Sequence, residues 1–308
     1  MNSIEGLVVA PFTPMKEDGS IQLDMIPPLY EHYREQKIVG AFINGSTGEG
    51  LSLTTRERKQ LAEKWNETIT DDFKLLIHVG HAGVEDAKSL GKHAAQLSNV
   101  TGISTVGPFY RKPADVGGLV DFCQQVAEAA PEVPFYYYHI PALTEVNFSM
   151  VDFLAEGSEK IPMLSGIKFS NYDYVDFSRC LEFADGKYDI MFGNDELMSC
   201  GLILGARGFV GSTYNLFPGL YHEILAAYER GDLSEVRRLQ RKSMEFVRLI
   251  DQYEYGGAAK GVMKLLGLDC GPARLPLQTI DAGELTALEK KLRETDFFSY
   301  AMDKAVQD

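Results

Sequence analysis

Residues 135–169, FYYYHIPALTEVNFSMVDFLAEGSEKIPMLSGIKF, contain two short runs of mostly apolar residues on either side of a longer amphipathic segment. The runs, 135–140 and 166–169, have the composition of strands that are buried on both faces. The distance between them fits one strand followed by one crossover helix. This stretch therefore predicts a βαβ unit with two parallel strands.

The same pattern recurs along the first 230 residues, about every 20 to 35 positions. The eight apolar runs are 6–12, 40–44, 75–80, 102–106, 135–140, 166–169, 190–193 and 208–211. Eight successive βα units predict an α/β fold of the closed (β/α)8 TIM-barrel type rather than an open doubly wound sheet. The turn after the first run, Pro11-Phe-Thr-Pro14, also lacks the glycines of a dinucleotide-binding sheet.

From about Leu233 onward the pattern changes to helices alone, at 233–253, 257–266 and 282–296. We therefore expect a barrel over residues 1–230 and a C-terminal helical annex over residues 231–308. Three helix starts are also predicted. They are Asp24, Asp195 and the sequence Thr54-Thr-Arg-Glu57, which resembles a capping box.

The composition limits the classes of function. The chain has 308 residues with 30 Lys+Arg and 44 Asp+Glu, a net charge of −14, and 45% hydrophobic residues. This is globular usage, and the acidity argues against nucleic acid as a partner. No run of 18 apolar residues and no secretory signal is visible, so we expect no membrane span. The four cysteines are far apart, which favours a reducing cytoplasm, and the six histidines show no metal-ligand spacing.

In a barrel of this kind, catalysis occurs at the C-terminal ends of the strands. Five of the predicted strand ends carry polar or reactive residues, and these supply the candidate site. They are 44–50 (NGSTGEG), 137–141 (YYHIP), 168–170 (KFS), 193–196 (GNDE) and 211–215 (GSTYN).

Lys168 is the most informative of these residues, because it lies inside an apolar strand. Desolvation there is costly for an ammonium and favours the neutral amine, a carbonyl nucleophile that forms Schiff bases. The alternative is a lysine that extends from the strand end into water. By contrast, Lys260 and Lys264 lie in a predicted annex helix, and we expect both on a solvent-exposed face.

Tyr138 is the second candidate. Strand alternation places Tyr136 and Tyr138 on one face and Tyr137 on the other. Tyr138 is the last of its pair before Pro141, so its hydroxyl can reach the barrel mouth. A phenol held near an amine can relay protons there. The alternative is a core tyrosine bonded to a backbone carbonyl.

The turn Gly45-Ser-Thr-Gly48 offers backbone N–H groups and the hydroxyls of Ser46 and Thr47. A glycine-permissive turn of this kind makes a small anion site suited to a carboxylate. It lacks the length and the Gly-Lys-Ser/Thr ending of a nucleotide phosphate loop.

Taken together and in order, these strand ends resemble the pyruvate-dependent class I aldolases of the N-acetylneuraminate lyase and dihydrodipicolinate synthase family. The resemblance covers essentially the whole chain. Residues 45–49 (GSTGE) are similar to the pyruvate-carboxylate loop, Lys168 to the Schiff-base lysine and Tyr138 to the proton-relay tyrosine. Tyr110 matches a position at which family members project a tyrosine toward a neighbouring subunit's site.

Within the family, residues 137–144 (YYHIPALT), 193–196 and 271–277 (GPARLPL) are similar to the N-acetylneuraminate lyase branch. Dihydrodipicolinate synthases usually carry an arginine shortly after Tyr-x-x-Pro, where this chain has Ala142 and Leu143. One departure from the lyases is Glu145, at a position where they often have glycine.

The resemblance implies reversible cleavage of N-acetylneuraminate to pyruvate and N-acetylmannosamine by a cytoplasmic homotetramer, with no cofactor or metal. Lys168 and Tyr138 are the implied catalytic residues. The residues implied to bind substrate are Ser46, Thr47, Ser170, Gly193, Asp195, Glu196, Gly211, Ser212 and Tyr110. The alternatives are another pyruvate-dependent aldolase or 2-keto-acid dehydratase of the family, and a non-catalytic barrel that binds sialic acid or pyruvate.

Overall fold

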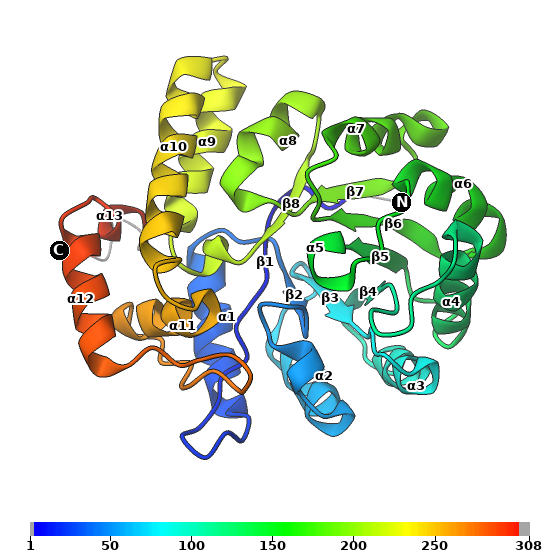
Figure 1. Cartoon of the computed structure of the whole chain (residues 1–308), viewed down its shortest axis with the longest axis horizontal. Helices are drawn as coiled ribbons and strands as arrows, with labels where there is room; N and C mark the ends of the chain where they lie inside the picture. Colours follow the sequence, from blue (N-terminus) through cyan, green and yellow to red (C-terminus); the bar gives the residue numbers. More distant parts are fainter. Residues whose placement is uncertain (1–2, 302–308) are drawn as a thin grey trace.

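The computed structural model of the chain describes residues 3–301. Eight parallel strands form one closed barrel in chain order, which confirms the predicted (β/α)8 architecture (Figure 1). The strands are β1 (Gly6–Val9), β2 (Gly40–Ile43), β3 (Lys74–His78), β4 (Val100–Val106), β5 (Phe135–His139), β6 (Leu164–Phe169), β7 (Asp189–Phe192) and β8 (Gly208–Gly211). Each predicted apolar run overlaps one strand, and only the ends differ.

Helices surround the barrel on the outside (Figure 1). The crossover helices are α1 (Ile26–Glu35), α2 (Thr55–Thr68), α3 (Val84–Ala94), α4 (Val116–Glu128), α6 (Met150–Lys160), α7 (Tyr174–Glu182), α8 (Met198–Leu204) and α9 (Pro218–Glu229), and a short α5 (Pro141–Thr144) follows β5. Alternate strand residues face outward into the shell between strands and helices, and the others fill the barrel. Tyr137 belongs to the outer cluster, whereas Tyr136 and Tyr138 belong to the interior one, as predicted.

Four helices follow the barrel: α10 (Leu233–Ile250), α11 (Tyr255–Leu265), α12 (Ala282–Arg293) and α13 (Phe298–Ala301). They share the outer apolar core, because Phe217 just before α9 contacts Phe246 of α10 edge-on at 5.3 Å and Phe297 at 5.5 Å between ring centroids. Helix α9 ends and α10 begins on either side of residue 230, where the barrel and the annex are divided. That division remains a prediction.

The predicted helix starts have mixed outcomes. Thr54 and Glu57 form the capping box of α2, with each side chain accepting from the other's backbone N–H. The prediction for Asp24 is wrong, because α1 begins at Ile26 with prolines in its first turn and no side-chain cap. The prediction for Asp195 as a helix cap is also wrong. Its carboxylate accepts hydrogen bonds from Thr213 instead.

The expectation of a solvent-exposed Lys260 is wrong as well. Its side chain is 1% exposed and pairs with Glu49, whereas Lys264, one turn further along α11, is 59% exposed as predicted. Small residues around Lys260, including Gly257 and Gly261, let the chain after α11 pack directly on this face of the helix. A pattern of charged residues on a helix does not reveal such a covering segment.

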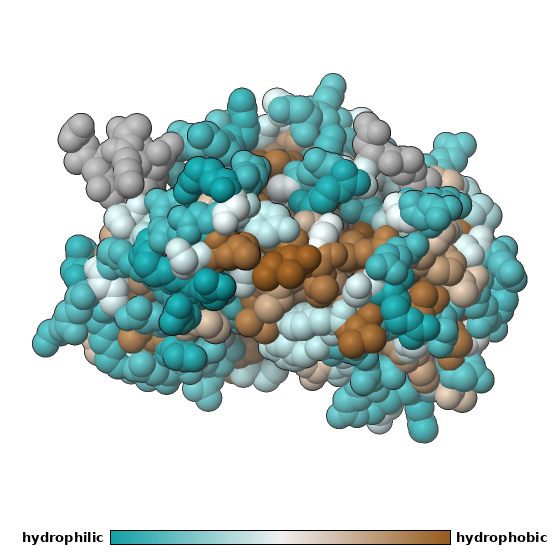
Figure 2. Space-filling view, turned by 90° about the horizontal axis from the view of Figure 1, so that it is seen from above, coloured by the Kyte–Doolittle hydropathy of each residue, from teal (hydrophilic) through white to brown (hydrophobic). Residues whose placement is uncertain are grey.

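Polar side chains cover most of the face seen in Figure 2, but apolar ones gather near its centre, over the side of the molecule that carries α7 and α8. Val175 of α7 and Ile203 of α8 are exposed apolar side chains. Within residues 3–301, no helix combines the length and apolar character needed to cross a membrane.

Candidate active site

A cavity of about 470 Å³ opens at the C-terminal ends of the strands. All the predicted site residues except Tyr110 line this cavity: Ser46, Thr47, Tyr138, Lys168, Ser170, Gly193, Asp195, Glu196, Gly211 and Ser212. The prediction that the site lies at the C-terminal ends of the strands therefore grouped residues from five separate segments of the chain that do line one cavity.

Lys168 lies on β6 between Tyr138 of β5 and Met191 of β7. It is only 4% exposed, so it does not extend into water. Its Nζ lies 4.0 Å from the ring centroid of Phe42 and 4.1 Å from that of Tyr138. Among the described residues, no carboxylate oxygen lies within 4.0 Å of this nitrogen. The amine is thus buried, next to aromatic faces, and without a counter-ion.

Tyr138 is buried inside the barrel mouth, where its ring packs edge-on against Phe42 at 5.3 Å and against His78 at 6.0 Å. In the part of the chain that the structure describes, its hydroxyl has no hydrogen-bond partner, so the alternative of a core tyrosine bonded to a carbonyl does not hold. The phenol is free to exchange a proton with a molecule bound beside Lys168.

The turn after β2 is held by its own backbone. Glu49 N–H donates to the Ser46 carbonyl and Gly50 N–H to the Gly45 carbonyl, both at 3.0 Å. Asn44 and Glu49 have φ values of 59° and 54°, in the left-handed region. A Cβ on Gly50 would lie 1.8 Å from the Asn44 carbonyl oxygen, so only glycine fits there.

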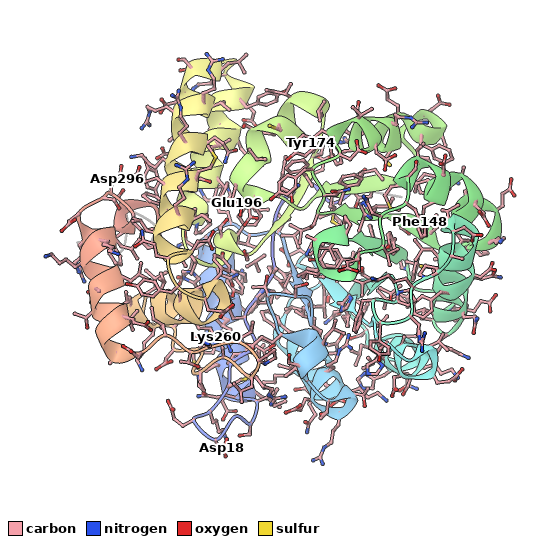
Figure 3. The ribbon with its side chains drawn as sticks, viewed as in Figure 1. Asp18, Phe148, Tyr174, Glu196, Lys260 and Asp296 are labelled. Carbon is pink, nitrogen blue, oxygen red and sulfur yellow. The ribbon has the colours of Figure 1, made fainter. Side chains whose placement is uncertain are left out.

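The opposite wall of the cavity is acidic. The Asp195 carboxylate accepts hydrogen bonds from Thr213 N–H at 2.8 Å and from its hydroxyl at 2.6 Å. The charge on Asp195, and secondly burial, raise the pKa of Glu196 to about 7. A Cβ on Gly211 would lie 2.6 Å from the Asp195 carboxylate, so the absence of a side chain there leaves room for it. Figure 3 shows Glu196 between α10 and the barrel.

The remaining predicted residues are tied to one another or to the annex. Ser170 Oγ donates to the Gly193 carbonyl at 3.1 Å. A Cβ on Gly193 would lie 2.1 Å from Ser170 Oγ, so the absence of a side chain at Gly193 leaves room for this hydroxyl. Ser212 Oγ lies 2.9 Å from the hydroxyl of Tyr255, the first residue of α11. These hydroxyls thus face the cavity from β6 and β8.

Sequence reasoning missed several residues of the cavity wall. They are Tyr172, Asn194, Asp251, Glu254, Tyr255 and Leu277. Four of them, Asp251, Glu254, Tyr255 and Leu277, belong to the annex, which contains no barrel strand whose end could have pointed to them. Asn194 lies inside the quoted segment 193–196, and so could have been named from it.

His78 is a buried interior residue near Tyr138 that received no role from the sequence. Its Nδ1 lies 3.0 Å from the Asn44 carbonyl, and the Arg58 guanidinium donates to the His78 carbonyl at 2.6 Å. Burial, followed by the charge on Arg58, holds the pKa of His78 well below its usual value. Over residues 3–301, no group of three or more His, Cys, Asp or Glu side chains is arranged to hold a metal ion.

Tyr110 is 82% exposed and does not line the cavity of its own chain. Beside that cavity lies a second hollow of about 220 Å³, which shares Ser46 and Leu143 with it and is also lined by Phe109. Glu145 adopts φ 54°, a conformation that suits the glycine often found at this position, and its carboxylate pairs with Lys112.

A closed (β/α)8 barrel with a buried, unpaired lysine at the mouth defines a lysine-centred TIM barrel. Residues 3–295 match the Dihydrodipicolinate synthetase family, and the chain therefore belongs to that family. N-acetylneuraminate lyase of Homo sapiens is 38% identical over 302 residues, which cover 96% of this chain and 94% of that protein. N-acetylneuraminate lyase of Gallus gallus is 40% identical over 281 residues, 89% of this chain and 90% of that protein.

Among solved structures, Proteus mirabilis N-acetylneuraminate lyase superposes with a TM-score of 0.93 at 36% identity, covering 96% of this chain and all (100%) of that one. That of Aliivibrio salmonicida gives a TM-score of 0.93 at 33% identity, covering 96% and 98%. These findings confirm the family resemblance seen in the sequence.

Proposed function

We propose that the protein acts as an N-acetylneuraminate lyase, which reversibly cleaves open-chain N-acetylneuraminate to pyruvate and N-acetylmannosamine. The observation that carries this proposal is the buried Lys168 amine, which lies 4.1 Å from the ring centroid of Tyr138 and has no carboxylate partner among residues 3–301. The N-acetylneuraminate lyases that align with nearly the whole chain support it further.

In the proposed mechanism, the Lys168 amine attacks the C2 ketone and water leaves, which forms an iminium. The C3–C4 bond then breaks, and its electron pair moves toward the iminium nitrogen to give an enamine. Tyr138 takes the proton of the C4 hydroxyl, so that the sugar half leaves as an aldehyde. Proton return to C3 and hydrolysis release pyruvate and regenerate the amine.

The residues that line the cavity suit the two halves of this substrate. In our proposal Ser46 and Thr47 after β2, with the Gly211 backbone, bind the carboxylate. Asp195 and Glu196 after β7 accept hydrogen bonds from the hydroxyls of the neutral sugar half, because their negative charge suits a polyol better than a carboxylate. Ser170 and Ser212 add hydroxyls that donate and accept.

The rival activities are less well supported. Ala142 and Leu143 line the cavity where a dihydrodipicolinate synthase usually has an arginine, so a second carboxylate finds no partner there. A pure sialic acid or pyruvate binder does not require a buried lysine beside a free phenol. Another keto-acid aldolase of the family would share these residues, and the choice between these activities depends on the substrate panel below.

Borohydride reduction with pyruvate, followed by peptide mass analysis, tests the covalent step. We expect a pyruvyl-derived mass increase on Lys168 and none on Lys260, and we expect Lys168→Ala to lose both trapping and cleavage. An unmodified Lys168, or substantial cleavage by the alanine variant, would overturn the covalent mechanism. Comparing turnover of N-acetylneuraminate with that of other 2-keto-acid aldol substrates then identifies the preferred reaction.

We further propose that the protein works as a cytoplasmic homotetramer and requires no cofactor, because Lys168 itself is the covalent catalyst. The four cysteines are free thiols, in keeping with a reducing compartment. Tyr110, Leu51 and Leu143 are exposed near the second hollow, and Val175 and Ile203 are exposed on α7 and α8. Two exposed apolar sets of this kind suit two kinds of subunit contact.

A further inference from the structure

The turn that carries Ser46 and Thr47 contains an energetically unfavourable residue whose side chain is buried. Glu49 has φ 54° without being glycine, and its side chain is only 3% exposed. A left-handed backbone conformation costs energy at a residue with a side chain, and it persists only where the surrounding contacts stabilise it. The contacts of the Glu49 carboxylate therefore decide how this turn is held.

Both carboxylate oxygens of Glu49 have partners from the C-terminal part of the chain. Lys260 Nζ on α11 lies 2.6 Å from Oε1, and the Arg274 backbone N–H donates to Oε2 at 2.6 Å. Lys260 Nζ also donates to the Pro272 carbonyl at 2.8 Å. Figure 3 places Lys260 on α11, beside the segment that returns toward the barrel.

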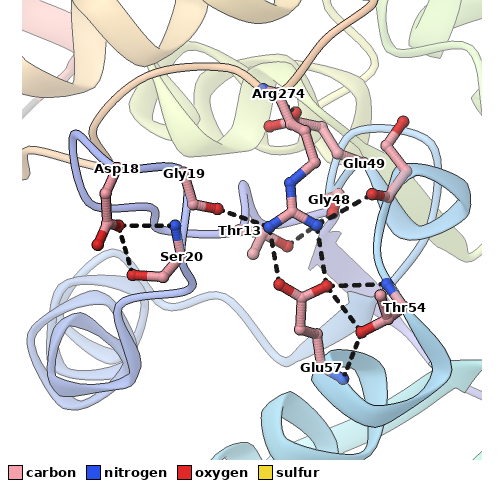
Figure 4. Close-up of polar contacts among 10 residues, drawn as sticks. Thr13, Asp18, Gly19, Ser20, Gly48, Glu49, Thr54, Glu57 and Arg274 are labelled. Atoms are coloured by element: carbon pink, nitrogen blue, oxygen red, sulfur yellow. Dashed lines mark hydrogen bonds and ion pairs between the residues drawn. The ribbon is translucent and has the colours of Figure 1, made fainter.

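The returning segment is itself fixed to the barrel. The Arg274 guanidinium binds both carboxylate oxygens of Glu57 at 2.7 and 2.9 Å and donates to the carbonyls of Gly19 and Ser52 (Figure 4). Arg274 also holds the pKa of Glu57 down at about 2. The chain that contacts Glu49 is therefore also anchored at Gly19 and at Glu57 of α2, outside the turn itself.

Glu49 is connected in turn to Ser46, a residue of the turn that lines the cavity. The Glu49 N–H donates to the Ser46 carbonyl at 3.0 Å, and Thr13 Oγ1 donates to the Gly48 carbonyl at 2.6 Å. A buried ion pair is expensive to desolvate, and apolar packing between the same elements would hold them with less cost. The charged pair instead fixes the orientation of the Glu49 carboxylate, because each of its hydrogen bonds is directional.

We propose that Lys260 is a positioning residue, which acts through Glu49 to hold Ser46 and Thr47 in the geometry that binds the substrate carboxylate. This inference rests on the proposed function, because it takes the turn to be the carboxylate site. It assigns to the annex a part in substrate binding although Lys260 itself does not line the cavity.

The test compares two ketones in borohydride trapping at Lys168. Pyruvate carries the carboxylate and acetone lacks it, while both offer a carbonyl to the amine. In Lys260→Met, we expect the half-saturating concentration of pyruvate to rise about tenfold or more and that of acetone to change by less than about twofold. Lys264→Met is the matched control, because this lysine is exposed on the same helix, and it should leave both values unchanged.

Parallel changes for the two ketones, or no change for either, would overturn the inference, because a general loss of structure affects both. Thermal melting shows whether each variant folds. Should Lys260→Met fail to fold, the double variant Glu49→Gln/Lys260→Met leaves no unpaired buried charge and is tested in the same way. If the wild-type protein does not trap pyruvate, the proposed function fails. If it does and the variants keep the wild-type half-saturation for pyruvate, only the positioning role fails.

Discussion

At the scale of single residues, the proposed chemistry depends on the surroundings of two buried lysines. Lys168 and Lys260 are both buried lysines, yet within the described part of the chain only Lys260 of the two has a carboxylate partner. The Lys260 ammonium is held by hydrogen bonds to Glu49 and to the Pro272 carbonyl, whereas the Lys168 amine lies against the rings of Phe42 and Tyr138. The partner of each lysine, rather than its burial alone, is why we propose a catalytic role for Lys168 and a positioning role for Lys260.

At the residue scale, Tyr138→Phe should lower kcat by about 10²–10⁴-fold, because the variant loses general acid–base help. Imine formation at Lys168 should persist, since the amine and its aromatic surroundings stay in place. Steady-state kinetics and borohydride trapping on the same preparation measure the two effects. Near wild-type turnover would assign the proton relay to another group, such as the substrate's own carboxylate.

Glu196 should give a pH dependence to the sugar half of the site. Its pKa is raised to about 7, chiefly by the charge on Asp195, so it gains a proton as the pH falls through this value. The charged carboxylate is the better acceptor for sugar hydroxyls, so kcat/KM for N-acetylneuraminate should fall below about pH 7. Profiles of kcat/KM against pH measure this.

Two variants check the assignment of that titration. Glu196→Gln should abolish it, and Asp195→Asn should move it to lower pH, because the main cause of the raised pKa is removed. Trapping of pyruvate at Lys168 should change little in either variant. A titration that survives unchanged in Glu196→Gln belongs to a different group.

At the scale of elements, the N-terminal segment packs against the barrel at the N-terminal ends of its strands. The Asp189 carboxylate at the start of β7 accepts from Ile4 N–H and from the Tyr136 hydroxyl, both at 3.2 Å. Burial outweighs these bonds and raises the pKa of Asp189 to about 6. The folded chain therefore binds this proton more tightly than the unfolded chain, and this contribution to stability is lost as the pH rises from about 4 to about 6.

Asp189→Asn should accordingly increase the free energy of unfolding above about pH 6, by roughly 1–3 kcal/mol, and have little effect below about pH 4. Denaturant unfolding at several pH values measures the difference. Asp185→Asn, at an exposed position on the segment before β7, is the control and should show no such trend. A constant gain at every pH would show that the effect does not come from this titration.

At the scale of the whole molecule, Tyr110 is 82% exposed and lies outside the cavity of its own chain, and we predict that it completes a neighbouring subunit's site in a tetramer. We expect light scattering to give about 137 kDa, four times the 34.2 kDa of one chain. Lys168→Ala and Tyr110→Ala should each be inactive or severely impaired. Mixed tetramers of the two should regain part of the activity, because some sites then combine an intact Lys168 with a neighbour's Tyr110.

Two results would contradict this arrangement. A fully active monomer at micromolar concentration would show that each chain works alone. Tetramers of the mixed variants that stay inactive after subunit exchange would show that Tyr110 does not complete a neighbouring site. Exchange itself can be followed with differently tagged chains.

The amino-acid sequence by itself predicted the barrel and the strand-end residues that line the cavity. The eight apolar runs specify buried parallel strands through local composition, and strand alternation places Tyr138 inside the barrel and Tyr137 outside it. Because parallel strands all end at the same rim, residues at their C-terminal ends meet without any knowledge of distant contacts. Lys168, Ser46 and Glu196 could be grouped for this reason.

Only the tertiary structure decided the contacts that depend on packing between segments far apart in the chain. Glu49 and Arg274, 225 residues apart, meet because the segment after α11 returns to the barrel mouth. The same return covers Lys260, for which the sequence predicted an exposed position. Tyr255, at the start of α11, reaches the cavity wall and contacts Ser212, which lies 43 residues earlier in the chain. Local periodicity encodes which face of an element is apolar, but not which distant segment covers it.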